Sequence, residues 1–167
     1  GQGTSFYLFF PVCATTEDKH DASPDKPSPM GKGEKLMVVD DEADIRNSTA
    51  ELLEDYGYRV STFENGAAGF EAFKNNPDAF DLIISDMTTP MMTGMQLAQS
   101  VLAIRPDQLI FISTGFGDAA DKKTAMASGV SGFFEKPLIM ETLLTEVRMC
   151  LDHSKKKREK SVSVGEA

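Results

Sequence analysis

The sequence predicts an α/β protein, a doubly wound five-stranded parallel sheet with helices on both faces. Five short runs rich in apolar or β-branched residues recur along the chain, and a segment with helical apolar spacing follows each of them. Because strand–helix–strand connections are nearly always right-handed, five such units in alternation predict one parallel sheet. The expected strands lie at 36–39, 59–63, 81–85, 109–113 and 131–134.

The elements are marked by different signals. The run at 36–39 is Leu-Met-Val-Val, which suits a strand covered on both faces, whereas residues 59–63 alternate weakly and suit a strand nearer a sheet edge. Asn65 is the expected N-cap of the second helix. The expected helices lie at about 45–56, 66–75, 94–104 and 118–128, and a last helix starts at Met140 and ends in the basic run 155–158.

Length and composition limit the class of protein. With 167 residues, one domain with a sizeable core is expected. The formal net charge of −9 argues against a nucleic-acid or membrane-surface binder, because such partners need basic faces, and no apolar stretch is long enough to cross a bilayer. The two cysteines, Cys13 and Cys150, predict no disulfide framework and fit a reducing, cytoplasmic compartment.

The first 33 residues differ in character from the rest. An aromatic run, FYLFF at 6–10, precedes a polar, proline-containing stretch that has no periodicity and is typical of a solvated linker. No basic residues precede the run and Pro11 follows it, so a signal peptide is not expected. The expected organisation is an N-terminal segment at 1–12, a linker at 13–33, a domain at 34–154 and a charged tail at 155–167.

Polar residues follow the expected strands at one edge of the sheet. Asp40 and Asp41 follow the first strand, Asp86 the third, Thr114 the fourth and Lys136 the fifth. Singly, each has a structural explanation as a helix cap, a turn residue, a polar strand end or a surface lysine. Together they favour a binding site, because ligands of open α/β sheets bind at the carboxyl ends of the strands. Three neighbouring carboxylates need a cation, and oxygen ligands favour Mg²⁺ over zinc.

Four segments, LMVVDDE, LIISDMTTPMMTG, FISTGFGD and GFFEKPL, resemble in order and spacing the motifs of response-regulator receiver domains. The resemblance extends from Lys35 to about His153. It implies a flavodoxin-like fold with strand order 2-1-3-4-5, in which the first and third strands are neighbours. It also implies a signalling domain rather than an enzyme in its own right. Its partner would be a phosphohistidine donor, on a histidine kinase or a histidine phosphotransfer protein.

The resemblance also assigns roles at the acidic edge. Asp86 would be the phosphoacceptor. Asp41 would bind Mg²⁺ directly, Asp40 through water, and Thr88 through its backbone carbonyl. Mg²⁺ and Lys136 would neutralise the phosphoryl oxygens while Asp86 attacks in line.

Two further residues would report the phosphorylated state. By the same resemblance, Thr114 would bond the phosphoryl group, and Phe133 would fill the space that Thr114 leaves. This would change the surface of the fourth helix, fifth strand and fifth helix. The Lys136–Pro137 bond resembles the cis peptide of the family. Thr89 before Pro90 and the bulky Phe116 depart from the usual pattern and leave the lifetime of the phosphoaspartate open.

The opening GQGTSFYLFFPV resembles the closing motif and last strand of the ATP-binding domain of sensor histidine kinases. Followed by a linker and a receiver, it predicts the C-terminal part of a hybrid sensor histidine kinase, which could be membrane-anchored through a preceding part. Two alternatives are a pseudo-receiver that only binds proteins and an Asp-nucleophile phosphatase of the haloacid dehalogenase type. No acidic or acceptor residue of the receiver pattern is missing, and Thr88 stands where that phosphatase has an aspartate. A homodimer is also open.

Overall fold

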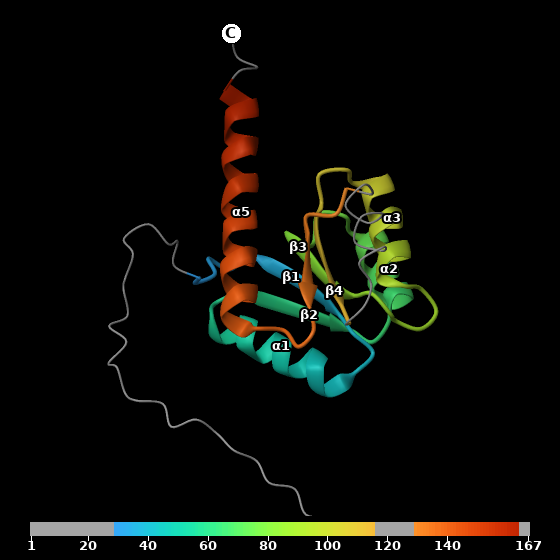
Figure 1. Cartoon of the computed structure of the whole chain (residues 1–167). Coiled ribbons are helices and arrows are strands. Elements are labelled where there is room, and N and C mark those ends of the chain that lie inside the picture. The colour runs from blue at the N-terminus through green and yellow to red at the C-terminus, as the bar shows by residue number, and fades with distance from the viewer. Residues whose placement is uncertain (1–28, 116–128, 164–167) are drawn as a thin grey trace, which may run out of the picture.

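The computed structural model of the chain describes residues 29–115 and 129–163, without the side chains of 158–163 (Figure 1). The described part contains five strands and four helices in alternation, except that β5 follows β4 directly among the described elements. The expected helix at 118–128 lies outside the described residues, as does the aromatic run at 6–10. The elements are β1 Lys35–Val39, α1 Ala43–Asp55, β2 Arg59–Phe63, α2 Gly66–Asn75, β3 Leu82–Asp86, α3 Gly94–Ile104, β4 Leu109–Thr114, β5 Gly132–Glu135 and α5 Met140–Ser163.

All strand pairs are parallel, and the strand order is β2-β1-β3-β4-β5. The predicted fold class and strand order are therefore confirmed. The weakly alternating strand β2 lies at an edge of the sheet, as predicted, and its residues are mostly exposed. β1 and β3 are central, and every residue of β3 is buried.

Two helical layers cover the sheet, α1 and α5 on one face and α2 and α3 on the other (Figure 1). Strand β1 shows why its run is apolar throughout. Leu36 and Val38 belong to the core beneath α1 and α5, whereas Met37 and Val39 belong to the core beneath α2 and α3. Because successive side chains of a strand point to opposite faces, a strand covered on both faces has no solvent-facing position.

Local signals set the helix ends. Asn65 caps α2 as predicted, since its side chain accepts a hydrogen bond from Ala68 N at 2.9 Å. Thr93 caps α3 in a reciprocal pair with Gln96. At the C-terminus, α5 continues to Ser163, so residues 155–163 of the segment expected to be a charged tail are helical. Among the described helices, none is long and apolar enough to span a bilayer.

Candidate functional site

The carboxyl ends of four strands bring the predicted residues to one edge of the sheet. Strand register places Val39 beside Ser85, and Asp86 beside Ser113. Asp40 directly follows β1 and Asp86 is the last residue of the neighbouring β3, so the two aspartates lie at the same level of the sheet. Because all strands are parallel, the residues that follow β4 and β5 reach the same edge.

The ammonium group of Lys136 lies between two of the carboxylates at this edge. Its Nζ lies 3.0 Å from Asp40 Oδ2 and 3.0 Å from Asp86 Oδ1. Glu42 Oε1 is farther away, at 3.8 Å. Burial disfavours the charged form of Lys136, but the hydrogen bonds to Asp86 and Asp40 outweigh that effect, so the pKa of Lys136 is raised. The lysine is therefore fully charged at neutral pH.

Asp86 is a buried carboxylate whose two oxygens are both engaged. Oδ1 faces Lys136 and also accepts a long hydrogen bond from Ser113 Oγ at 3.4 Å, while Oδ2 accepts from Thr88 N at 3.1 Å. The following loop folds tightly over the aspartate, because Gly94 N donates to Met87 O at 3.0 Å. A Cβ at Gly94 would collide with the carbonyl oxygen of Asp86, so this approach requires glycine.

Thr114 ends β4 at this edge, and Phe133 lies in β5 beside Ile112 of β4. Thr114 is completely buried, and its Oγ1 has no hydrogen-bond partner among the described residues. Phe133 is half-buried and packs against the core beneath α2 and α3. The Thr114 hydroxyl is therefore an unused hydrogen-bond donor at the end of β4. Burial of such a group costs free energy, so a new acceptor nearby would stabilise it. The Lys136–Pro137 peptide is cis, as predicted.

Comparison with known proteins agrees with this arrangement. The family model for the response regulator receiver domain matches residues 36–148. The chain belongs to this family. Receiver domains are signalling domains of two-component systems that interact with histidine kinases or phosphotransfer proteins, and they bind Mg²⁺ for phosphorylation.

Individual relatives cover the receiver to different extents. Response regulator receiver protein CpdR of Brucella abortus (strain 2308) is 31% identical over 117 residues, which are 70% of this chain and 96% of CpdR. A crystal structure of a response regulator receiver domain protein from Clostridium thermocellum is 30% identical with a TM-score of 0.70, over 73% of this chain and 97% of that one. Sensor kinase CckA of Brucella abortus (strain 2308) is 26% identical over 160 residues, which are 91% of this chain but 17% of CckA.

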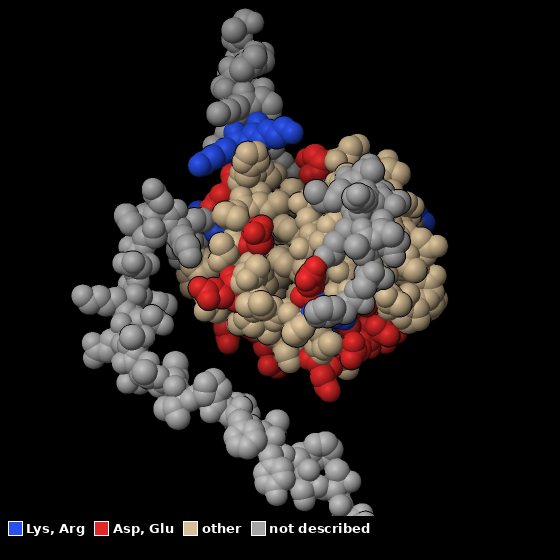
Figure 2. Space-filling model, in the orientation of Figure 1, with Lys and Arg blue, Asp and Glu red and all other residues tan. Residues whose placement is uncertain are grey.

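The donor chemistry of the receiver suits a hard cation. Asp40 and Asp86 carry two negative charges and share one ammonium, and acidic side chains gather on the edge of the molecule that carries α1 (Figure 2). Asp41 and Glu42 are exposed there. Excess negative charge and oxygen ligands fit Mg²⁺. Within the described ranges, however, no three acidic, histidine or cysteine side chains surround one point, so the placement of Asp41 as a direct ligand stays a prediction.

Asp40 is fixed by the turn that follows β1. Its Oδ1 accepts from Glu42 N at 2.9 Å, and its carbonyl oxygen accepts from Arg46 Nη1 at 2.5 Å. Asp40 is 4% exposed, which separates it from the exposed Asp41. Thr88 is exposed as well, and its described contact is the backbone N–H to Asp86. The structure thus brings together Asp40, Asp86, Thr114 and Lys136, with Asp41 and Thr88 at the rim.

Sequence reasoning did not single out Ser113 and Gly94. Ser113 directly precedes Thr114 in β4, and its position beside Asp86 follows only from the register of β3 and β4. A glycine eight residues after Asp86 could have been read as a close backbone approach.

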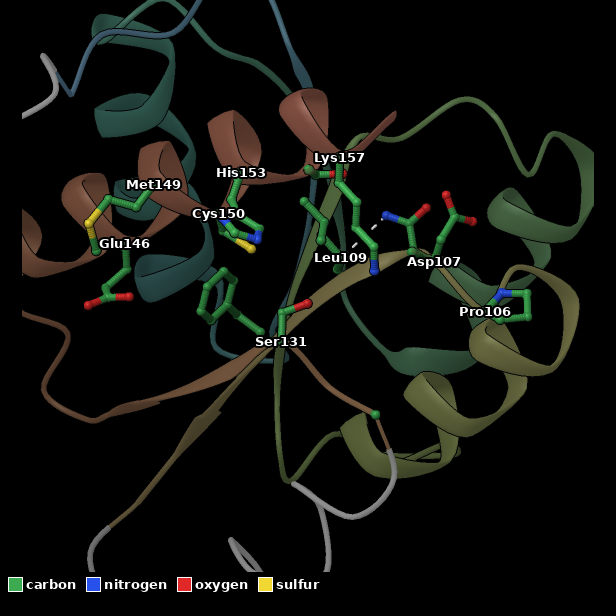
Figure 3. Close-up of a pocket in the computed structure, with 13 residues that line it drawn as sticks. Pro106, Asp107, Leu109, Ser131, Glu146, Met149, Cys150, His153 and Lys157 are labelled. Atoms are coloured by element: carbon green, nitrogen blue, oxygen red, sulfur yellow. Dashed lines mark hydrogen bonds between the residues drawn. The ribbon is translucent and has the colours of Figure 1, made fainter. Parts of the chain in front are cut away.

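Two of the hollows on the described surface bear on the site. One, of about 300 Å³, borders the site and is lined by Asp44, Ile45, Ser48, Thr49, Lys136, Pro137, Leu138 and Met140. The other, of about 730 Å³, lies at the opposite edge of the sheet between α5 and the starts of β4 and β5 (Figure 3). Leu109, Ser131 and Cys150 line it, and burial raises the pKa of the Cys150 thiol. None of the predicted site residues belongs to this second hollow.

Proposed function

We propose that this receiver accepts a phosphoryl group from a phosphohistidine onto Asp86 in a Mg²⁺-dependent reaction. The observation that carries the proposal is the 3.0 Å contact between Lys136 Nζ and Asp86 Oδ1 at the carboxyl edge of the sheet. It places a fixed cation where negative charge would accumulate during transfer. Asp40 at the same ammonium supplies a second carboxylate for metal binding.

The chain's own residues suit the transfer step. One carboxylate oxygen of Asp86 forms the bond to phosphorus while the P–N bond of the phosphohistidine breaks, and the electron pair stays on the imidazole nitrogen. Lys136 neutralises a phosphoryl oxygen, and Thr88 N–H holds the other oxygen of the Asp86 carboxylate at 3.1 Å. When bound, Mg²⁺ would supply further positive charge to the phosphoryl oxygens, with Asp41, Asp86 and the Thr88 carbonyl as its proposed direct ligands and Asp40 binding it through water.

Thr114 and Phe133 form the proposed switch. The Thr114 hydroxyl is a donor without a partner among the described residues, and a phosphoryl oxygen on Asp86 would give it one. Inward movement of Thr114 leaves room for Phe133, which is half-buried in the present state. The surface made by β5 and α5 then differs between the two states.

The test of phosphoryl transfer is the intact mass of the protein after incubation with acetyl phosphate and Mg²⁺. We expect one added phosphoryl group in the wild type and none in Asp86→Asn. Asp78→Asn is the matched control, because Asp78 is an exposed carboxylate whose contact with Arg105 is 3.8 Å long. Labelling that persists in Asp86→Asn would place the acceptor elsewhere.

We further propose that the receiver belongs to a hybrid sensor histidine kinase. Two observations support this origin. The opening GQGTSFYLFFPV resembles the end of a kinase ATP-binding domain, and the match to sensor kinase CckA covers 91% of this chain, which is more than the receiver alone. The test is the coding sequence upstream of Gly1. It should encode the rest of an ATP-binding domain and a phosphorylatable histidine, and an unrelated upstream domain would contradict the proposal.

A further inference from the structure

A buried ionic cluster joins α5 to the residues before β1, at the edge of the sheet opposite Asp86. Glu34 Oε1 lies 3.0 Å from Arg148 Nη1 and 2.8 Å from Lys155 Nζ. Arg148 Nη2 lies 2.8 Å from Asp152 Oδ1, and Lys32 Nζ lies 3.5 Å from the same oxygen. The side chains of Glu34 and Arg148 are only 2% and 1% exposed, so this pair is the buried centre of the cluster.

The cluster also holds the segment 29–33 by its backbone. Met30 O accepts from Arg148 Nη1 at 3.4 Å, and Lys32 N donates to Glu34 Oε2 at 2.5 Å. No residue of 29–33 is fully buried. The segment is therefore attached by polar contacts rather than by apolar packing. One set leads to the ionic cluster through Met30 and Lys32, and a second set is made by Pro29, Gly31 and Gly33 with residues 56–58.

Such an attachment fixes geometry more than it adds stability. Desolvation of a buried ion pair largely cancels its attraction, and apolar replacements of similar size are often as stable. Burial opposes ionisation of Glu34, but hydrogen bonds led by that from Lys155 outweigh it and lower the pKa of Glu34 to about 2. Arg148 Nε is buried without a partner among the described residues, so the hydrogen-bonding capacity of the guanidinium is incompletely satisfied. A small movement of α5 can therefore change which hydrogen bonds the guanidinium makes.

Helix α5 connects this cluster to the site. It begins at Met140, shortly after Lys136, and Arg148 lies about 12 Å farther along the helix axis. A phosphoryl group on Asp86 would compete for the ammonium that now bonds Asp86 and Asp40. A tilt of α5 by about 5° at its start would move Arg148 by about 1 Å, which is enough to break a hydrogen bond of ordinary length.

We propose that Glu34 and Arg148 form an ionic latch that holds residues 29–33 against α5 and opens when α5 tilts. The latch couples the state of Asp86 to the path of the chain that enters the receiver. The holding role depends only on the observed contacts, whereas the coupling rests on the proposed phosphoryl transfer.

The test follows the amides of Gly31 and Gly33 by hydrogen exchange in the whole chain. Their N–H groups donate to Tyr56 O at 2.6 Å and Gly57 O at 3.2 Å, so they report whether the segment is in place. Exchange is measured with and without Mg²⁺ and beryllofluoride, a phosphoryl analogue. The double variant Glu34→Met/Arg148→Met removes the latch with apolar side chains, and a thermal melt verifies its fold. Lys74→Met, which removes an exposed ion pair on α2, is the control.

In the wild type and in Lys74→Met, we expect slow exchange that becomes at least ten-fold faster when the analogue binds. In Glu34→Met/Arg148→Met, exchange should be fast in both conditions. Slow exchange in the folded double variant would overturn the latch. Unchanged wild-type exchange with the analogue demonstrably bound would overturn the coupling. If the analogue does not bind, the proposed function fails, and the comparison of wild type with double variant still decides whether the latch exists.

Discussion

Lys136 and Asp40 are 96 residues apart in the sequence, yet Lys136 Nζ lies 3.0 Å from Asp40 Oδ2. The contact joins the end of β5 to the end of β1, although β3 and β4 lie between these strands in the sheet. Because the same ammonium also bonds Asp86, it offsets the negative charge of two carboxylates that are the expected ligands of a metal ion.

Replacement of Lys136 by methionine should therefore have opposite effects on metal binding and on phosphorylation. Without the ammonium, the charges of Asp40 and Asp86 are no longer offset, and Mg²⁺ affinity should rise by at least a factor of about 5. That factor is about 1 kcal/mol, the energy of two unit charges about 4 Å apart in bulk water. Phosphorylation by acetyl phosphate should slow by at least ~10-fold, because the phosphoryl oxygens lose their cation. Mg²⁺ titration and intact mass over time measure the two effects. Weaker Mg²⁺ binding in the variant would contradict the shared-charge argument.

Asp41→Ala should weaken Mg²⁺ binding more than Asp40→Ala. Asp41 is exposed and free to take a direct position on the ion, whereas Asp40 is buried with Lys136 and Glu42 N as partners. Loss of a direct carboxylate ligand should lower affinity by roughly 10-fold or more. Both variants are titrated with Mg²⁺ under the same conditions. Wild-type affinity in Asp41→Ala would remove Asp41 from the ligand set.

Thr114→Val separates stability from signalling. The hydroxyl that this change removes is fully buried and has no partner among the described residues, so the unfolding free energy should stay within about 1 kcal/mol of the wild type or increase. Binding of beryllofluoride should weaken by about 10-fold, because a hydrogen bond to a charged group is lost. Ser113→Ala removes a neighbouring hydroxyl and should weaken binding less. A large loss of stability in Thr114→Val would show that the hydroxyl already has a structural role.

The fold and the acidic edge were predictable because each depends on strand ends. Fully apolar runs such as 36–39 mark strands covered on both faces, and in a parallel sheet the residues that follow such runs must share an edge. This reasoning places Asp40, Asp86 and Lys136 together without knowledge of distances. It does not decide which carboxylate is buried, so the difference between Asp40 and Asp41 emerged only from the structure.

The ionic cluster was not predictable by the same route. Glu34 and Arg148 lie 114 residues apart, and their hydrogen bond exists because α5 crosses the start of β1. In sequence, a charged residue such as Arg148 within an amphipathic helix suggests a solvated face, and Lys155 suggests a helix end. Only tertiary packing shows that these cations face a buried acid. The extension of α5 to Ser163 was not predicted either, because residues 155–163 lack helical apolar periodicity.

The low pKa of Glu34 predicts a specific acid dependence of stability. Its folded value of about 2 lies below the ordinary 4.5, so above pH 4.5 the fold with ionised Glu34 is more stable than the fold with protonated Glu34 by roughly 3 kcal/mol. This difference is lost as pH falls toward 2. The difference in unfolding free energy between wild type and Glu34→Gln should be largest at pH 7 and shrink at pH 3. Urea unfolding at both pH values measures it. A difference that is the same at pH 7 and pH 3 would contradict the assigned shift.

The N-terminal limit of the folded unit is the last prediction. Deletion of residues 1–28 leaves every described contact in place, so the melting temperature and the phosphorylation by acetyl phosphate should match those of the whole chain. Deletion of residues 1–33 also removes the hydrogen bonds of Pro29 O with the Tyr58 hydroxyl and of Gly31 N with Tyr56 O, together with the contacts of 30–32 to the ionic cluster.

At roughly 1 kcal/mol for each net hydrogen bond, the longer deletion should cost about 2–4 kcal/mol of unfolding free energy. The acidic edge lies at the other end of β1, so the shortened protein should still be phosphorylated while it is folded. Urea unfolding of the two truncated proteins, measured side by side, gives the comparison. Equal unfolding free energies of the two truncated proteins would show that segment 29–33 does not stabilise the domain. The folded unit would then begin at residue 34, as the sequence alone predicts.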